Sequence, residues 1–275
     1  MGQIMLTKSR FRLAEDGHQV GELAKRMYPG GFEITSGSID EQVRETDVLL
    51  ERDDVVLFEP TFCFENLLVR VDILVKNGNQ IQLIEVKSRG FHPGEDSFAA
   101  KRSRVASGWR PYLYDVAYQE MVVKNTRPDW NITPYLMLLD KSVAASVHGL
   151  GAAFSVRKKG RRVLVDVDPD FEFNAQVPPL LRKHDVTEEV KWLQDNLVDL
   201  PSGQETFQDF IARLSDYDTV GRDIEPSPGS QCKSCEFYCS PDDQTESQRS
   251  GWHECMGPLL KESGYIERKD TVFGL

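Results

Sequence analysis

Two apolar stretches joined by a short polar turn constrain the fold of this chain more than any other feature. Residues 67–75 and 80–87 are rich in β-branched side chains, and the four residues between them read Lys-Asn-Gly-Asn. Asn-Gly favours a tight hairpin turn because both residues tolerate the positive φ angles that such turns require. The sequence therefore predicts an antiparallel hairpin here, with a further strand over residues 55–62 directly before it.

The rest of the chain shows helical and strand-like spacing around this hairpin. Apolar residues at helical spacing predict helices over residues 14–28, 39–51, 112–125, 186–198 and 204–215. The apolar run 134–139 is typical of a buried strand, and residues 154–167 predict a second hairpin around Gly160. Residues 88–111 are rich in Gly, Ser, Arg and Pro and predict a mobile loop. This order predicts an α/β fold with a central mixed sheet flanked by helices.

The composition suits a globular protein with one main domain and a small appendage. Of the 275 residues, 40% are apolar, which is enough for a sizeable core. We expect residues 1–220 to form the main domain, and residues 221–275 to form a small cysteine-bearing segment packed on it. The sequence shows neither a membrane-spanning apolar run nor the features of a signal peptide, so we expect a cytoplasmic protein without a membrane partner.

The charge balance bears on the partners that this chain can bind. The net charge of −11 argues mildly against passive binding to polyanions. It does not exclude a nuclease, because bound divalent ions reverse the sign of an acidic site. Basic residues gather at positions 157–162 and 101–104, where they either face solvent or contact phosphates.

An acid–acid–lysine constellation lies on the predicted hairpin. Asp72 is a carboxylate inside an apolar strand, and Glu85 and Lys87 share one face of the next strand. Burying these charges without partners is costly, and a divalent cation such as Mg²⁺ or Mn²⁺ would balance both carboxylates. The alternative interpretation is an ordinary cross-strand salt bridge between Lys87 and an acid.

The same residues suit phosphodiester hydrolysis. This reaction needs a metal-activated water and stabilisation of the negative charge that develops on the phosphate. Asp72 and Glu85 would hold the metal, and the backbone carbonyl of Val86 would add a ligand. Lys87 would orient the attacking water, help to deprotonate it, or neutralise the phosphate.

The two motifs RVDIL and LIEVKS, at residues 70–74 and 83–88, resemble motifs II and III of the PD-(D/E)xK nucleases in the RecB-like branch. The resemblance covers about residues 5–255 and implies a restriction-endonuclease-like core. It implies a catalytic Gln119, which lies in YDVAYQEMVV, although Val123 replaces the tyrosine that usually follows in this branch. It also implies a metal ligand from the first helix, for which Glu22 ranks before His18.

Four of the five cysteines, Cys232, Cys235, Cys239 and Cys255, lie close together near the C-terminus. Soft thiolates at this density select zinc or an iron–sulfur cluster, and a single close C-x2-C pair fits zinc less well. The similarity to AddB-type and CRISPR-adaptation exonucleases implies a [4Fe-4S] cluster. The cysteine segment that usually follows LTKSRF in this branch is missing, so either Cys239 is the fourth ligand or the site is incomplete. Cys63 is expected to be a buried core thiol, with participation in the cluster as the alternative.

Together these observations predict a Mg²⁺- or Mn²⁺-dependent nuclease. We expect a DNA exonuclease that acts on single strands or duplex ends in DNA repair, recombination or phage-related processing. Two other classes stay open at this point. One is a catalytically inactive nucleic-acid-binding module, and the other is a zinc- or iron–sulfur-bearing interaction protein.

Overall fold

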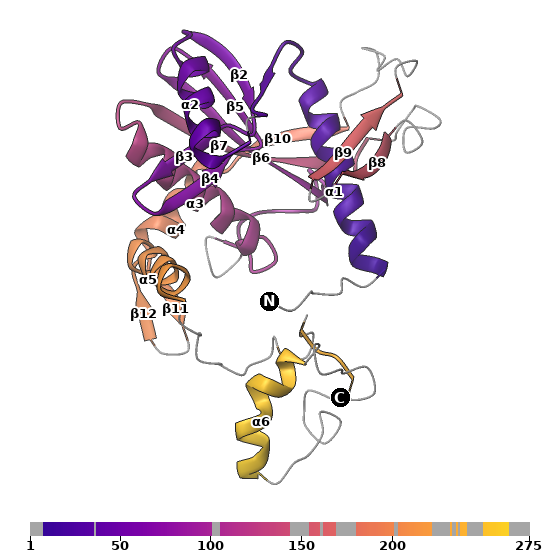
Figure 1. Cartoon of the computed structure of the whole chain (residues 1–275), viewed down its shortest axis with the longest axis vertical. Helices are drawn as coiled ribbons and strands as arrows, with labels where there is room; N and C mark the ends of the chain where they lie inside the picture. The colour runs from indigo at the N-terminus through magenta and orange to yellow at the C-terminus, as the bar shows by residue number, and fades with distance from the viewer. Residues whose placement is uncertain are drawn as a thin grey trace. The chain divides into compact units, whose positions relative to one another are not determined.

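The computed structural model describes residues 8–35, 37–100, 105–143, 154–159, 162–168, 180–200, 203–221, 232, 235, 237–240 and 250–263. The chain divides into two compact units. The first consists of Thr7–Asp199 and Gln204–Ser215, and the second of Met1–Leu6, Leu200–Gly203 and Asp216–Leu275. Figure 1 shows both units.

The first unit is built around a six-stranded mixed sheet, which confirms the predicted α/β class with a central mixed sheet. Its strands, in spatial order, are β1 (Phe32–Glu33), β2 (Asp54–Phe58), β5 (Ile73–Asn77), β6 (Gln80–Phe91), β7 (Asn131–Asp140) and β10 (Leu181–Asp185). β5 and β6 form the predicted antiparallel hairpin, and its turn contains Gly78 at a φ of 53°. β6 pairs with β7 in parallel, and β10 then pairs with β7 antiparallel.

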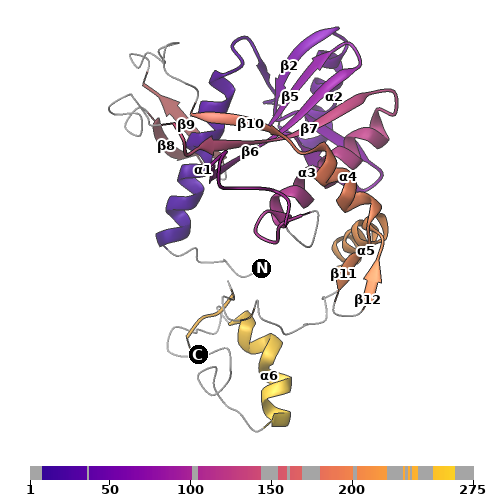
Figure 2. The ribbon, with the colours of Figure 1, turned by 180° about the vertical axis from the view of Figure 1, so that it is seen from behind.

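The helices of the first unit flank this sheet on both faces. They are α1 (Lys8–Arg26), α2 (Ile39–Leu50), α3 (Arg110–Thr126) and α4 (Thr187–Asp195). α5 (Phe207–Val220) belongs to this unit as far as Ser215. Ile84 of β6 packs towards Ala24 of α1, whereas the next residue, Glu85, contacts Gln119 of α3. Since neighbouring side chains on a strand point to opposite faces, α1 and α3 cover opposite faces of the sheet (Figure 2). None of the helices in the described part of the chain has the length and hydropathy that a membrane crossing requires.

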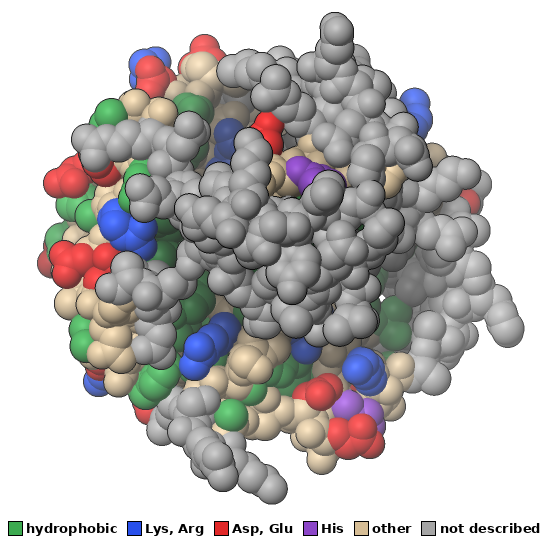
Figure 3. Space-filling view, turned by 90° about the horizontal axis from the view of Figure 1, so that it is seen from below, with side chains coloured by type: hydrophobic (Ala, Val, Ile, Leu, Met, Phe, Trp, Pro, Cys, Tyr) green, Lys and Arg blue, Asp and Glu red, His purple; other side chains and the backbone are tan. Residues whose placement is uncertain are grey.

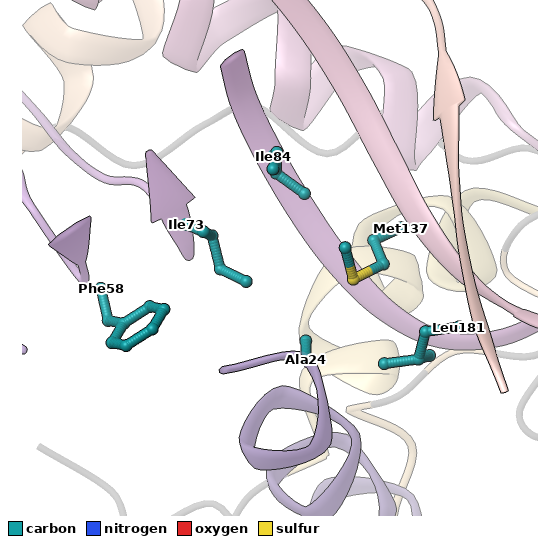
Figure 4. Close-up of a cluster of buried hydrophobic side chains, with 6 residues drawn as sticks. All are labelled: Ala24, Phe58, Ile73, Ile84, Met137 and Leu181. Carbon is teal, nitrogen blue, oxygen red and sulfur yellow. The ribbon is translucent and has the colours of Figure 1, made fainter. Parts of the chain in front are cut away.

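The core beneath α1 joins most of the strands of the central sheet. Its six buried side chains come from α1 and from five strands, and Figure 4 draws them: Ala24, Phe58, Ile73, Ile84, Met137 and Leu181. Val86 packs against the same cluster. Burial of such side chains contributes roughly 1.5–3 kcal/mol each relative to exposure. The end of α1 is therefore fixed against β6 beside the acid–acid–lysine motif.

The strands that lead to Asp72 differ from the prediction. Residues 55–62 do not form one strand, because the chain turns at Glu59, whose φ is 57°, between β2 and β3 (Thr61–Phe64). Residues 67–75 are likewise divided between β4 (Leu67–Arg70) and β5. β3 and β4 pair with each other in a separate hairpin. Asp72 therefore lies in the break between β4 and β5, directly before Ile73, and not inside a strand.

The end of β6 also differs from the prediction. β6 continues through Phe91, so the first residues of the predicted loop 88–111 belong to the sheet. Phe91 is buried against Phe98, Trp109 and His184, and this distant cluster holds the strand extended beyond the predicted end.

The predicted helix 186–198 ends at Asp195, and α5 begins at Phe207 and not at residue 204. Short strands β11 (Val198–Leu200) and β12 (Gly203–Glu205) pair between them. The second predicted hairpin is confirmed as β8 (Phe154–Lys159) and β9 (Arg162–Val167).

Candidate active site

Asp72 lies directly before β5, with its carboxylate directed at β6. Its Oδ2 atom accepts a hydrogen bond of 2.7 Å from the backbone N–H of Val86. Burial, with the nearby Glu85 carboxylate as the next cause, raises the pKa of Asp72 well above its usual range. An ionised Asp72 in this position is costly without a further positive partner.

Glu85 is the most buried acid of the motif, and it is held by two neighbours. Only 6% of its surface is exposed. The Nζ atom of Lys87 lies 2.6 Å from Oε1, and Nε2 of Gln119 donates to Oε2 at 2.7 Å. Lys87 also donates to Asp115 of α3 at 3.0 Å. The structure thus brings together the predicted Glu85, Lys87 and Gln119. The ion pair left open as an alternative is present, but it joins two residues of the same strand.

The ion pair fixes the charge state of Lys87. Burial alone would lower the pKa of Lys87, but the carboxylates of Glu85 and Asp115 together outweigh this effect, and the pKa is raised. A lysine in this setting keeps its proton at neutral pH. It can therefore orient a water or neutralise a phosphate, whereas accepting a proton from water is disfavoured.

A cavity of about 600 Å³ lies between α1 and the strands, next to Asp72. Its charged lining comprises four acids, two basic residues and a histidine: Glu22, Glu33, Glu59, Asp72, Lys25, Arg70 and His18. Val86 also lines it, whereas Glu85 faces α3 on the other side of β6. The acids outnumber the basic residues, so the cavity favours a cation over an anion.

The two candidates from the first helix both reach this cavity. Glu22 is paired with Lys25 at 3.9 Å and with Arg26 at 3.5 Å, and its side chain is 22% exposed. His18 is exposed at the rim. Within the described residues, no three His, Cys, Asp or Glu side chains form a group that could hold a metal ion. Of the predicted ligands, Glu22, His18 and Asp72 line the same cavity, whereas Glu85 lies on the other side of β6.

Glu59 lines the same cavity and was not among the site residues predicted from the sequence. Burial raises the pKa of Glu59; Lys25 opposes that effect, and Glu33 and Glu85 reinforce it. Its backbone N–H donates to the carbonyl of Asp72 at 3.2 Å, so the two acids are positioned together. The signal was visible in the sequence as an acid within an apolar run, which is the signal that identified Asp72.

The second unit carries the C-terminal cysteines. Trp252 and Met256 of α6 (Gly251–Ser263) are buried, and Cys232 and Cys235 pack against them. Partial desolvation raises the pKa of Cys255, and the neighbouring Cys235 and Cys232 thiols raise it further. These three thiols are therefore close enough to interact electrostatically.

The remaining cysteines behave differently. The Cys239 thiol donates to the carbonyl of Ser240 at 3.5 Å. All five cysteines are free thiols. The prediction that Cys63 is a buried core thiol is wrong, because Cys63 is exposed on β3 while its neighbour Phe62 points into the core.

The two basic groups lie partly outside the described residues. Lys101, Arg102 and Arg104 are among the residues that are not described, as are the side chains at positions 158–162. Arg157 is described, and its guanidinium pairs with Asp166. Figure 3 shows acidic and basic side chains interspersed among the described residues on the face that it draws.

Comparisons with known protein families, with curated proteins and with solved structures find no match for this chain. The interpretation of the site therefore rests on its own chemistry. Two buried acids, a protonated lysine and a glutamine converge on the β5–β6 hairpin, and a cavity opens beside Asp72. Carboxylate oxygens are the kind of ligand that hard divalent cations prefer, and a protonated lysine attracts anions.

Proposed function

We propose that this chain is a Mg²⁺- or Mn²⁺-dependent deoxyribonuclease of the PD-(D/E)xK superfamily, in its RecB-like branch, which acts on DNA ends. The proposal includes a restriction-endonuclease-like core. One observation carries it: Asp72, Glu85, Lys87 and Gln119 come from three separate segments and meet around the β5–β6 hairpin. An ordinary salt bridge would not need the second buried acid or the glutamine.

The donor chemistry fits a hard divalent cation. Asp72 and Glu85 are carboxylates that repel each other in a buried setting, and a cation between them would remove that cost. Mg²⁺ usually keeps several waters and binds through one or two carboxylates together with substrate phosphates. A full protein ligand shell is therefore unnecessary. Asp72 and Glu85 would hold the ion, with the Val86 carbonyl as a further ligand. Glu22 and His18 line the cavity on the Asp72 side of β6, so they would reach the ion only from that side.

The bound ion would supply a more acidic water and would offset the charge of the phosphate. The side chains of the protein do the rest. Lys87, kept protonated by Glu85, would place its positive charge beside the phosphate and orient the water. Gln119 fixes the Glu85 carboxylate from the opposite side. Glu59 shares the cavity with Asp72 and adds to its negative potential.

The same proposal assigns a [4Fe-4S] cluster, or alternatively a structural zinc, to the second unit. Cys232, Cys235 and Cys255 support it because their thiols interact, and Cys239 would be the fourth ligand. The role would be structural, since no feature of the sequence calls for electron transfer. Iron and zinc analysis of protein purified without oxygen distinguishes the two metals.

Degradation of end-labelled DNA tests the proposed activity. Single-stranded and duplex substrates are incubated with the full chain, purified without oxygen, in the presence of Mn²⁺ or of EDTA. We expect Mn²⁺-dependent shortening from the ends. If the intact protein leaves both substrates unchanged in Mn²⁺, the enzyme assignment is wrong, and a binding module becomes the better interpretation.

A further inference from the structure

β6 carries a second cation just beyond Lys87. The Cζ atom of Arg89 lies 3.9 Å from the centre of the Trp109 ring and 5.4 Å from that of Tyr112. The Nζ atom of Lys87 lies 6.0 Å from the same Tyr112 ring. Tyr112 is therefore shared by both cations, and Arg89 extends the charged row of the proposed active site by one step along the strand.

The guanidinium rests on a rigid support. Trp109 is only 4% exposed, and it packs against Phe91 at 5.6 Å and Phe98 at 5.1 Å between ring centres. One Nη atom of Arg89 also donates to the backbone carbonyl of Gly108. Stacking on an aromatic face together with a backbone hydrogen bond leaves the guanidinium little freedom, so an incoming ligand does not have to order it.

The charge of Arg89 lacks an acidic partner in the part of the chain that the structure describes, where no carboxylate lies within 4.0 Å of it. Lys87 differs, because it has both Glu85 and Asp115. The half-buried Arg89 carries five N–H donors, and only one of its nitrogens makes a hydrogen bond to a described residue. A partly desolvated guanidinium without a counter-charge favours an anion, and its planar fork matches a phosphate.

The backbone of β6 is irregular at the same place. Val86 pairs with Met137 and Gly90 with Leu139, so that three residues of β6 lie opposite one residue of β7. Irregularities of this kind redirect side chains and are common beside active sites. Here the irregular segment contains both Lys87 and Arg89.

We propose that Arg89, steadied by Trp109 and Tyr112, binds a backbone phosphate of a nucleic-acid strand next to the phosphate at Lys87. This inference rests on the proposed nuclease function and adds a strand-positioning residue to it. Contacts to backbone phosphates carry no sequence information and set the register of the strand. Arg89 would thus determine which phosphodiester lies at Asp72 and Glu85, whatever the base sequence.

Binding of a fluorescent single-stranded oligodeoxynucleotide tests the proposal in EDTA, where metal-dependent cleavage is absent. Arg89→Gln removes the charge and keeps a planar terminal group that can pack on Trp109. Arg52→Gln is the matched control, because Arg52 also stacks on an aromatic ring, Phe32 at 4.3 Å, and the charge change is the same. We expect about tenfold weaker binding for Arg89→Gln and less than about twofold for Arg52→Gln. The slope of log affinity against log salt should become shallower by about 0.7 for Arg89→Gln alone.

The two proposals fail in different ways. Equal binding by Arg89→Gln and wild type, equal weakening by both variants, or no binding by wild type overturns the inference about Arg89. If Arg89→Gln weakens binding selectively but no protein cleaves DNA in Mn²⁺, the strand contact stands and the nuclease function fails. Tryptophan fluorescence and circular dichroism show whether Arg89→Gln is folded. If Arg89→Gln does not fold, Arg89→Lys is measured in its place, and it should retain the salt slope of the wild type because it keeps the charge.

Discussion

Replacing Lys87 with methionine should destabilise the metal-free protein through Glu85. The substitution keeps the length of the side chain and removes the charge that lies 2.6 Å from the Glu85 carboxylate. The two side chains are 25% and 8% exposed, so the pair is mostly but not fully buried. Breaking a fully buried pair costs about 3–5 kcal/mol, and the partial exposure of Lys87 reduces our estimate to about 2 kcal/mol. For a domain of this size, that corresponds to a fall in Tm of roughly 4–8 °C.

Thermal and urea unfolding in EDTA measure this effect, provided that the spectroscopic signal reports on unfolding of the first unit. Lys191→Met is the control, because Lys191 is exposed on α4 and a substitution there should change stability by less than about 0.5 kcal/mol. Mn²⁺ should restore part of the loss in Lys87→Met, since a cation can replace the missing charge beside Glu85. If Lys87→Met is no less stable than Lys191→Met, the Glu85–Lys87 ion pair does not hold the site as described.

Two further predictions concern the neighbours of this pair. Gln119→Leu removes the 2.7 Å hydrogen bond to the buried Glu85 and should lower the free energy of unfolding by about 1.5–3 kcal/mol. The control is Gln208→Leu at an exposed position of α5, which should have little effect. Urea unfolding of both variants checks this prediction. The raised pKa of Asp72 means that its stabilising contribution is complete below its unfolded-state pKa and is lost as the pH rises through its folded-state pKa. The metal-free wild type should therefore lose stability as the pH rises from the unfolded-state pKa of Asp72 through its folded-state pKa. A profile of Tm against pH that is the same in Asp72→Asn would contradict the assignment.

The parts of the fold that depend on local chemistry could be predicted from the sequence. The β5–β6 hairpin was predicted from the polar run 76–79, although its turn residues are Gly78 and Asn79, because Asn77 belongs to β5 and pairs with Gln80. Alternation along β6 correctly placed Glu85 and Lys87 on one face. Gln119, which the family resemblance singled out, donates a hydrogen bond to Glu85. Their prediction requires only local patterns: a turn, the two-residue period of a strand and the spacing of one helix.

The features that the sequence analysis missed depend on contacts between distant residues. The positive φ of Glu59 accompanies hydrogen bonds across the break, from Glu59 N–H to the Asp72 carbonyl and from Val71 N–H to the Pro60 carbonyl. Strand propensity alone predicts one continuous strand at this point. As a result, the position of Asp72 after a break and the cavity that Glu59 shares with it could not be predicted.

The extension of β6 has a similar cause. Phe91, Phe98, Trp109 and His184 pack together from positions far apart in the chain, and they order a segment whose composition indicates a loop. The support under Arg89 is part of this cluster. The sequence could therefore predict the acids and the lysine of the site, but it could not predict the arginine beside them.

Cleavage of end-labelled DNA by Asp72→Asn, compared with Asp129→Asn, tests the central claim most directly. Asp129 is exposed in the loop before β7, so its variant matches the chemical change without touching the site. We predict that Mn²⁺-dependent cleavage falls by at least about 100-fold in Asp72→Asn and is unchanged in Asp129→Asn. Equal cleavage by the two variants, with both folded and loaded with Mn²⁺, would contradict the claim that Asp72 holds the catalytic ion.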